Sequence, residues 1–183
     1  MAQEYPSVTP ALRDFIARQH IFFAASAAMD TRINISPRST REFRLLCDNE
    51  ACWLDLTGSG AETAAHMKAD GRLTIMFCAF EGPPNILRLY GRGEILHRDS
   101  AEFARVLADH FGNERPVGTR QIVRLKFDLV KTSCGYGVPA FSYDRERGAL
   151  DNWAEKKGRQ GVADYWREKN LVSMDGLPTG IVE

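Results

Sequence analysis

The segment Trp53–Phe80 reads WLDLTGSGAETAAHMKADGRLTIMFCAF, and it decides the fold because a strand, a turn, a helix and a second strand follow one another in it. Its first residues are apolar and strand-forming, and Leu73–Cys78 is an apolar run rich in β-prone residues. Between the strands, Ser59 is placed to cap a helix, and Glu62 three residues later completes a capping box. Gly71 is expected to end that helix.

The turn Thr57-Gly58-Ser59-Gly60 opens onto the start of this helix. A helix N-terminus presents unpaired N–H groups, which suit an anion such as a phosphate, so we expect any ligand of the protein here. The alternative is a turn that is only a tight connection. The turn matches neither a nucleophile elbow nor a nucleotide-binding phosphate loop, and Asp55 and His66 lie nearby without the order of a hydrolase triad.

Composition sets limits on the class of protein. The chain has 183 residues, of which 44% are hydrophobic, which predicts one soluble globular domain over residues 1–183. The 24 basic and 24 acidic residues balance, which argues against a nucleic-acid partner. No apolar run is long enough to span a membrane, and the N-terminus has no signal pattern. The four cysteines form no C-x-x-C pair, and the histidines show no metal-ligand spacing, so we expect free thiols in the cytoplasm and no metal.

The part of the chain before this segment is predicted to contain one helix and two strands. Thr9 followed by proline is a typical helix start. Ile21–Ala27 predicts a buried strand, and Ile33–Ser36 predicts a second strand by its alternation. Pro37 is expected either to end that strand or to place it at the edge of a sheet.

The remaining elements follow from the same kind of periodicity. They are a hairpin (43–47 and 51–56), a half-buried strand (86–96), an amphipathic helix (100–111) with a stripe of Phe103, Val106, Leu107 and His110, a last strand (121–130) and two polar helices (150–157 and 161–169). Gly91 and Gly93 allow a bend or bulge in the half-buried strand. The tail from Ser173 has no periodicity and is expected to be extended or mobile. These elements predict a mainly β (α+β) fold, a small antiparallel barrel with flanking helices and a helical C-terminal extension from about residue 148.

Three arginines at positions 38, 41 and 44 follow the second strand. One interpretation is a solvated basic loop. The other is an arginine presented to a phosphate or carboxylate, since a guanidinium group binds such oxyanions through two hydrogen bonds.

The order of several short motifs is similar to that of a known family. The motifs are Asn34-Ile35-Ser36-Pro37-Arg38, Leu54-Asp55-Leu56-Thr57-Gly58-Ser59-Gly60, Glu62-Thr63-Ala64-Ala65-His66 and Arg88-Leu89-Tyr90-Gly91-Arg92-Gly93. In this order they resemble the pyridoxamine 5'-phosphate oxidase-like, FMN-binding split-barrel superfamily over about residues 10–140. The Thr-Ser-Cys-Gly-Tyr-Gly-Val-Pro segment at 132–139 and the C-terminal extension resemble one branch of that superfamily, which has no characterised function.

The resemblance implies an antiparallel split barrel of the FMN-binding type, paired in a homodimer with two FMN sites at the interface. The cofactor-binding residues that it implies are Asn34, Ile35, Ser36, Pro37, Arg38, Leu56, Thr57, Gly58, Ser59 and Thr63. Three are expected at the flavin ring or ribityl chain (Asn34, Ser36 and Thr57) and three at the phosphate (Ser59, Thr63 and Arg38). The family has Ser-Arg-Lys at the phosphate, where this chain has Ala61-Glu62-Thr63.

Three functional hypotheses remain at this stage. The first is an FMN-dependent oxidoreductase acting on a small-molecule substrate, with no protein side chain as an evident acid or base. The second is a non-catalytic module of the same fold that binds or senses a flavin or haem. The third is a split barrel without a ligand that acts as a dimeric scaffold, and Glu62 at the expected phosphate position is the feature that favours it.

Overall fold

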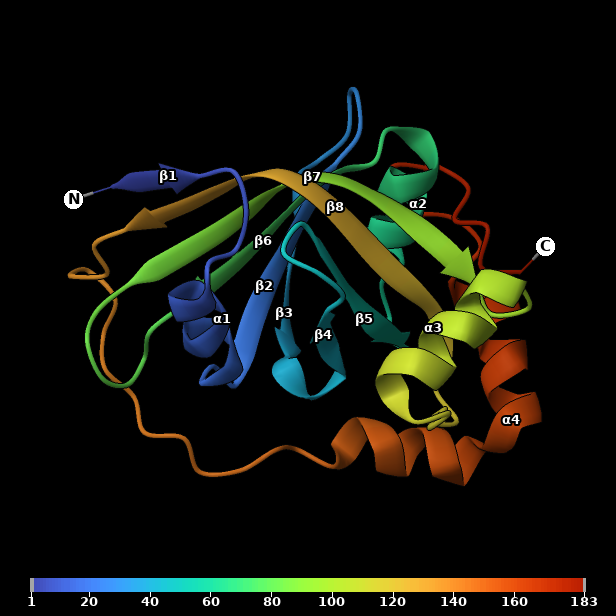
Figure 1. Cartoon of the computed structure of the whole chain (residues 1–183). Helices are drawn as coiled ribbons and strands as arrows, with labels where there is room; N and C mark the ends of the chain where they lie inside the picture. The colour runs from blue at the N-terminus through green and yellow to red at the C-terminus, as the bar shows by residue number, and fades with distance from the viewer. Residues whose placement is uncertain (1, 183) are drawn as a thin grey trace.

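The computed structural model describes residues 2–182, which form one curled sheet with helices around it (Figure 1). In chain order the elements are β1 (Gln3–Tyr5), α1 (Pro10–Ala17), β2 (Ile21–Ala27), β3 (Asn34–Ser39), the 3-10 helix η1 (Thr40–Glu42), β4 (Phe43–Leu45), β5 (Glu50–Leu56), α2 (Glu62–Ala69), β6 (Arg72–Cys78), β7 (Ile86–His97), α3 (Ala101–Phe111), β8 (Thr119–Ser133) and α4 (Ala149–Lys169).

Within the described residues the strands form a single sheet in the order β3-β2-β6-β7-β8-β5-β4, and β1 pairs with β8. Every pairing is antiparallel. The end strands of this order, β3 and β4, are not paired with each other, so the curled sheet stays open as a half-barrel. The predicted mainly β, antiparallel split-barrel fold with flanking helices is therefore confirmed.

Pro37 is expected either to end its strand or to place it at a sheet edge. The strand β3 contains Pro37 and lies at an edge of the sheet, so the second expectation is confirmed. An edge position suits proline because it has no N–H to donate to a further strand. The predicted bulge is also present, since the β7–β8 register shifts between Tyr90 and Gly91. A Cβ at Gly91 would lie 2.0 Å from the Lys126 carbonyl oxygen, so only glycine fits this crossing.

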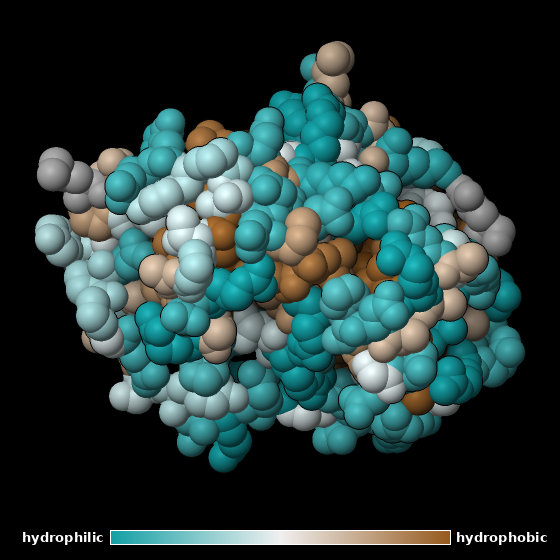
Figure 2. Space-filling view, viewed as in Figure 1, coloured by the Kyte–Doolittle hydropathy of each residue, from teal (hydrophilic) through white to brown (hydrophobic). Residues whose placement is uncertain are grey.

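The core fills the inside of the curled sheet. Its centre is a cluster of aromatic rings in which Phe22 contacts Phe43, Trp53 and Phe77. Helix α2 packs against β2, β6 and β7, and α3 closes a second cluster through Phe103, Val106, Leu107 and Phe111. The predicted α3 stripe is wrong at one position, because Phe111 is buried there while His110 is half-exposed. On the face seen in Figure 2, hydrophobic side chains show through a mainly hydrophilic surface near its middle.

The predicted capping box at α2 is wrong. The helix begins at Glu62 after Ala61, and no side chain caps it. Ser59 lies two residues before the N-cap position, which Ala61 occupies. By contrast, Thr9 caps α1, as the sequence indicates, and Ser100 caps α3.

The C-terminal extension folds back onto the barrel. Helix α4 consists of two helical pieces that meet at Gly158, whose φ of +69° breaks the helix. The tail after α4, which is expected to be extended or mobile, has little regular structure and contacts the rest of the protein. Thr179 and Ile181 are buried, and Arg32 at the β2–β3 turn donates its backbone N–H to Asp175 at 2.9 Å. In Figure 1 this red segment lies beside α2.

Two expectations from composition can be compared with the described residues. No helix in residues 2–182 is both long and apolar enough to cross a membrane. All four cysteines are free thiols, as predicted. Burial raises the pKa of Cys52 to about 12, so this thiol stays protonated and packs as a small apolar group.

Candidate functional site

A cavity of about 510 Å³, here called the polar pocket, lies between β3, the end of β5 and the start of α2. Eight residues that the sequence singles out line it: Asn34, Ser36, Pro37, Arg38, Leu56, Gly58, Ser59 and Thr63. The structure thus brings together in one cavity two motifs that lie some twenty residues apart in the chain. A volume of about 300–1,000 Å³ is typical of pockets that hold a cofactor or drug-sized ligand.

Two of the ten predicted residues do not line the polar pocket. Ile35 alternates away from it on β3 and is 63% exposed. Thr57 is buried behind the pocket wall, where its hydroxyl donates to the Gly118 carbonyl at 2.7 Å and accepts from the Trp166 indole N–H at 2.8 Å. Both hydrogen-bonding roles of the Thr57 hydroxyl are therefore used inside the protein.

The floor of the polar pocket is an ion cluster around Asp55, which is only 1% exposed. The Asp55 carboxylate lies 3.0 Å from the guanidinium group of Arg38 and 3.1 Å from that of Arg120. It also accepts a hydrogen bond from the Gln121 side-chain amide at 2.9 Å. Burial by itself raises the pKa of Asp55. Arg120, Arg38 and the Gln121 amide more than offset this effect and hold the pKa below its ordinary value. With two guanidinium groups and one carboxylate, the cluster carries an excess positive charge.

The turn at 57–60 is held from one side by this cluster and by α4. Arg120 donates to the Gly60 carbonyl at 2.9 Å, and Asn170 donates to the carbonyls of Gly58 at 3.4 Å and Ser59 at 3.3 Å. Arg120 also donates to the Asn170 side chain at 3.2 Å. Within the described part of the chain, the backbone N–H groups of residues 58–64 have no acceptor. The turn therefore has its carbonyls fixed and its N–H groups available to a ligand.

Glu62 and Thr63, which stand where the family has cations, are both engaged within the protein. The Glu62 carboxylate accepts from the backbone N–H of Met174 in the C-terminal tail at 3.1 Å. Thr63 accepts from the Asn34 amide at 3.1 Å, and that amide also approaches the Ser26 hydroxyl at 3.3 Å. The tail thus gives the unexpected Glu62 carboxylate a partner.

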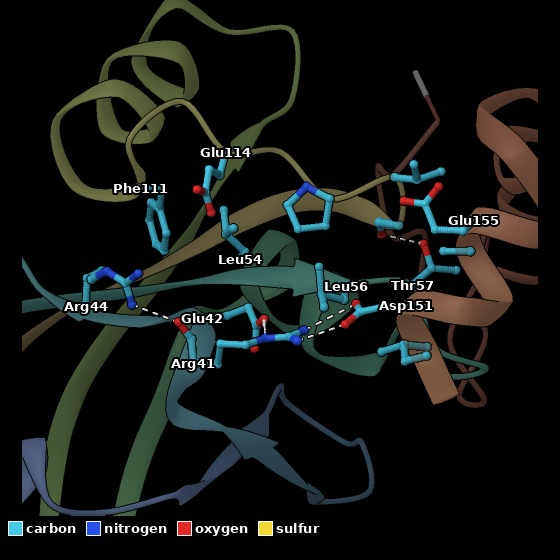
Figure 3. Close-up of a pocket in the computed structure, with 15 residues that line it drawn as sticks. Arg41, Glu42, Arg44, Leu54, Leu56, Thr57, Phe111, Glu114, Asp151 and Glu155 are labelled. Carbon is cyan, nitrogen blue, oxygen red and sulfur yellow. Dashed lines mark hydrogen bonds and ion pairs between the residues drawn. The ribbon is translucent and has the colours of Figure 1, made fainter. Parts of the chain in front are cut away.

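A smaller cavity of about 280 Å³ lies on the other side of β5, toward α3 and α4, and is called the small pocket (Figure 3). Figure 3 shows Arg41 pointing at Asp151 of α4. The Arg41 guanidinium group donates two hydrogen bonds to the Asp151 carboxylate, at 2.8 and 3.2 Å, and Arg41 also pairs with Glu42. Arg44 donates to the carbonyls of His110 and Arg41 at 3.0 and 2.8 Å. Arg41 and Arg44 therefore connect the sheet to the helices. Arg41 also lines the polar pocket, and Arg38 is the arginine of this group that pairs with Asp55 in its floor.

The third cavity is the largest, at about 1,200 Å³, and is called the apolar groove. It lies between α1, the β6–β7 loop at 80–85 and the irregular segment at 141–147. Pro37, Arg38 and Ser39 of β3, together with Glu146 and Arg147, line both this groove and the polar pocket. The two cavities are thus neighbours across one stretch of edge strand.

The sequence reasoning missed four residues that build the site: Arg120, Gln121, Trp166 and Asn170. The first two had only a weak signal, as adjacent polar residues near the start of β8, and it is the β5–β8 register in the structure that sets Gln121 opposite Asp55. Trp166 and Asn170 had none, since their contacts depend on how the C-terminal extension folds back.

Comparison with known proteins agrees with this geometry. Residues 8–134 match the family model described as pyridoxamine 5'-phosphate oxidase. The chain is 34% identical over 190 residues to the pyridoxamine 5'-phosphate oxidase family protein ustO of Aspergillus flavus, covering 95% of this chain and 76% of that protein. The chain therefore belongs to the pyridoxamine 5'-phosphate oxidase family.

Solved structures share the fold at low sequence identity. A putative pyridoxamine 5'-phosphate oxidase of Lactobacillus delbrueckii has a TM-score of 0.51 and 16% identity, over 69% of this chain and 94% of its own. HutZ, described as a haem storage protein of Vibrio cholerae, has a TM-score of 0.52 and 16% identity, over 70% of this chain and 97% of its own. At these identities the likeness concerns the fold alone.

Proposed function

We propose that this protein binds FMN in the polar pocket and acts as a flavin-dependent oxidoreductase, as a cytoplasmic homodimer with a cofactor site at each interface. Family membership supports the proposal, because members of this family often bind a flavin. The observation that carries it is the polar pocket itself, in which two separate motifs of the expected cofactor site converge. The dimer is part of the proposal because β3, which lines the pocket, is an edge strand with an exposed side chain at Ile35.

The residues present fit a ligand with a phosphate group. Backbone N–H groups and a buried arginine cluster would bind it in place of the family's Ser-Arg-Lys side chains. The free N–H groups at 58–64 converge at the start of α2, where the helix dipole favours an anion. The excess positive charge of the Asp55 cluster lies in the floor of the same pocket, and the Arg38 Nε–H is buried without an acceptor in the described residues. Glu62 opposes the anion, and its contact with Met174 reduces this opposition only in part.

The side chains of the pocket have binding and orienting roles in this proposal. Ser59 and the backbone of the turn hold the phosphate, and Arg38 adds charge from the floor. Asn34 and Ser36 on β3 offer amide and hydroxyl groups to the ring or ribityl chain. When bound, FMN supplies the hydride or electron transfer, so the pocket needs no acid or base of its own. The C-terminal extension keeps the turn in place from behind through Trp166 and Asn170.

A non-catalytic binding module is the second candidate. HutZ shares the fold and is described as a haem storage protein, which favours a haem or a flavin held without turnover. In the part of the chain that the structure describes, no group of three or more His, Cys, Asp or Glu residues is placed to hold a metal ion. A haem would therefore depend on one or two ligands.

The test is the spectrum and mass of whatever the purified protein carries, followed by addition of FMN and then of NADH or NADPH without oxygen. A flavin absorption band near 450 nm, with bleaching on reduction, supports the oxidoreductase. A flavin that no nicotinamide reduces supports the non-catalytic module, and a Soret band supports haem. A colourless protein that does not bind added FMN overturns the flavin proposal in both forms and leaves the dimeric scaffold.

A further inference from the structure

We propose that the buried His66 orients the Asn34 side chain, and that β3 thereby presents hydrogen-bond acceptors to the ligand of the polar pocket. A ligand that fits such a pocket carries hydroxyl or N–H donors in addition to its phosphate. The choice of FMN as this ligand rests on the proposed function. The orientation of Asn34 is a property of the protein alone and is tested separately below.

The first step is a group of four polar side chains that meet where α2 packs against β2. Ser26 and Asn34 are opposite each other in the β2–β3 register, so their side chains lie on the same face of the sheet. Thr63 and His66 are three residues apart on α2 and share one face of the helix. Asn34 donates to Thr63 at 3.1 Å. The Ser26 hydroxyl lies 3.0 Å from the Nδ1 atom of His66, so sheet and helix are linked at two points.

The second step is the direction of these hydrogen bonds, which follows from burial. Ser26 is 2% exposed and His66 is 0% exposed, so bulk water does not replace a missing partner. The Ser26 oxygen accepts from Asn34 at 3.3 Å, and within residues 2–182 the acceptor for the Ser26 O–H is Nδ1 of His66. A proton on Nδ1 would leave that O–H unpartnered, in addition to Nε2, which has no partner in the described residues. The imidazole proton of His66 therefore lies on Nε2, and Nδ1 accepts.

The third step is the orientation of Asn34. Both hydrogens of its Nδ2 group are used, one toward Ser26 and one toward Thr63. In the described chain its Oδ1 atom accepts from the Ser36 hydroxyl alone, at 3.4 Å, so a lone pair remains for a ligand. Asn34 and Ser36 both line the polar pocket. On the β3 side, the pocket therefore offers oxygen acceptors.

The turn and the start of α2 form a side of the polar pocket with the reverse polarity. The backbone N–H groups of residues 58–64 have no acceptor in the described part of the chain, and the pocket floor has an excess positive charge. A matching ligand has an anion toward the turn and hydroxyl or N–H donors toward β3. FMN has both, in its phosphate, its ribityl hydroxyls and its imide N–H. The peripheral groups of a haem include carboxylates and no such donors, so this polarity favours the flavin over the haem.

The experiment compares the affinities of variants for FMN and for inorganic phosphate. Ser26→Ala and His66→Leu break the link to Asn34, and each should weaken FMN about fivefold, the effect of one neutral hydrogen bond. Inorganic phosphate needs only the N–H groups of the turn, so its affinity, measured by calorimetry, should stay unchanged. His66→Asn keeps an amide oxygen that accepts at the position of Nδ1, and it should bind FMN like the native protein.

Ser100→Ala is the matched control for a lost hydroxyl. Ser100 caps α3 by accepting from the Phe103 backbone N–H at 3.1 Å, and it lies outside the polar pocket. This variant should lose stability and bind both ligands like the native protein. A second measurement needs no ligand. Nitrogen NMR of the isotope-labelled imidazole shows which atom of His66 carries the proton, and we expect Nε2.

Three results would overturn the proposal. One is a His66 proton on Nδ1 instead of Nε2. Another is an equal loss of FMN and phosphate affinity in Ser26→Ala, because the hydroxyl would then serve only the fold. The third is an FMN affinity that neither Ser26→Ala nor His66→Leu changes. A native protein that binds phosphate and no FMN would contradict the proposed function instead, and the NMR measurement then decides the orientation of Asn34 by itself.

Discussion

The polar pocket and the apolar groove share three residues of β3, yet they are built in opposite ways. The floor of the pocket is a buried ion cluster whose members are fixed by several short contacts from β5, β8 and α4. The far wall of the groove is the exposed, irregular segment 141–147, which has few hydrogen bonds to the rest of the protein. The difference teaches that one edge strand separates a pocket fixed by buried ion pairs from a groove with one loosely held wall.

The strongest test of this comparison is the removal of the Asp55 carboxylate, which should have the largest effect on stability. Asp55→Asn leaves the Arg38 and Arg120 guanidinium groups without their carboxylate, and Arg120 is only 3% exposed. We expect the free energy of unfolding, measured with urea, to fall by about 3–5 kcal/mol. Asp48→Asn is the matched control, because Asp48 pairs with Arg13 on the surface and should cost less than about 1 kcal/mol. Equal effects of the two changes would show that the cluster does not hold the pocket.

The pH dependence of stability follows from the same group. The pKa of Asp55 is lowered on folding, so its ionised form stabilises the protein above the unfolded-state pKa of about 4. This contribution is lost as the pH falls from about 4 through the lower pKa of the folded state. The free energy of unfolding of the native protein should therefore drop over this range more steeply than that of Asp55→Asn. Parallel curves would contradict the assignment.

A smaller effect is expected from the contact between the C-terminal extension and the turn. Trp166→Phe keeps an aromatic ring and removes the N–H that donates to Thr57, which should lower the free energy of unfolding by about 1–2 kcal/mol. Trp153→Phe is the control, since its ring packs on Tyr165 and no acceptor in the described residues meets its indole N–H. If Trp153→Phe costs as much, the hydrogen bond to Thr57 has no special part in holding the turn.

Glu62 tests the charge balance of the pocket. Glu62→Gln keeps an oxygen that accepts from the Met174 N–H and removes the negative charge beside the proposed phosphate. FMN should bind about fivefold more tightly, which corresponds to roughly 1 kcal/mol for one charge near a partly solvated phosphate. Affinity is measured by quenching of flavin fluorescence. Unchanged or weaker binding would place the phosphate away from this turn.

The smallest effect belongs to the groove. Arg147 is exposed and has no partner in the described residues, so Arg147→Gln should change the free energy of unfolding by less than about 0.5 kcal/mol. The measurement is the same urea titration used for Asp55→Asn. A loss of more than about 1 kcal/mol would mean that Arg147 stabilises the fold and that the groove wall is not loosely held.

Much of the fold could be predicted from the sequence because its signals are local. Alternation, turn residues and the Thr9 cap depend on neighbours within a few positions. Gly91 and Gly93 likewise marked the bulge in β7 in advance. The one failed cap, at α2, shows the limit of such signals, since a shift of two residues moved Ser59 from the helix start into the turn.

The site could be predicted in part. The resemblance brought the β3 motif and the turn together, and eight of the ten residues do line one cavity. The positions of Thr57 and Glu62 could not be foreseen, because their partners, Trp166 and Met174, lie more than one hundred residues further along the chain. No periodic pattern or spacing connects groups that meet only when the C-terminal extension folds back onto α2.

The central claim is that the polar pocket holds FMN, and a titration of FMN with the purified protein tests it most directly. If FMN enters the polar pocket, free-flavin fluorescence should change to a plateau at one FMN per chain, and the Glu62→Gln variant should reach that plateau at lower protein concentration. If flavin fluorescence and absorption stay those of free FMN at a large excess of both proteins, the claim is wrong.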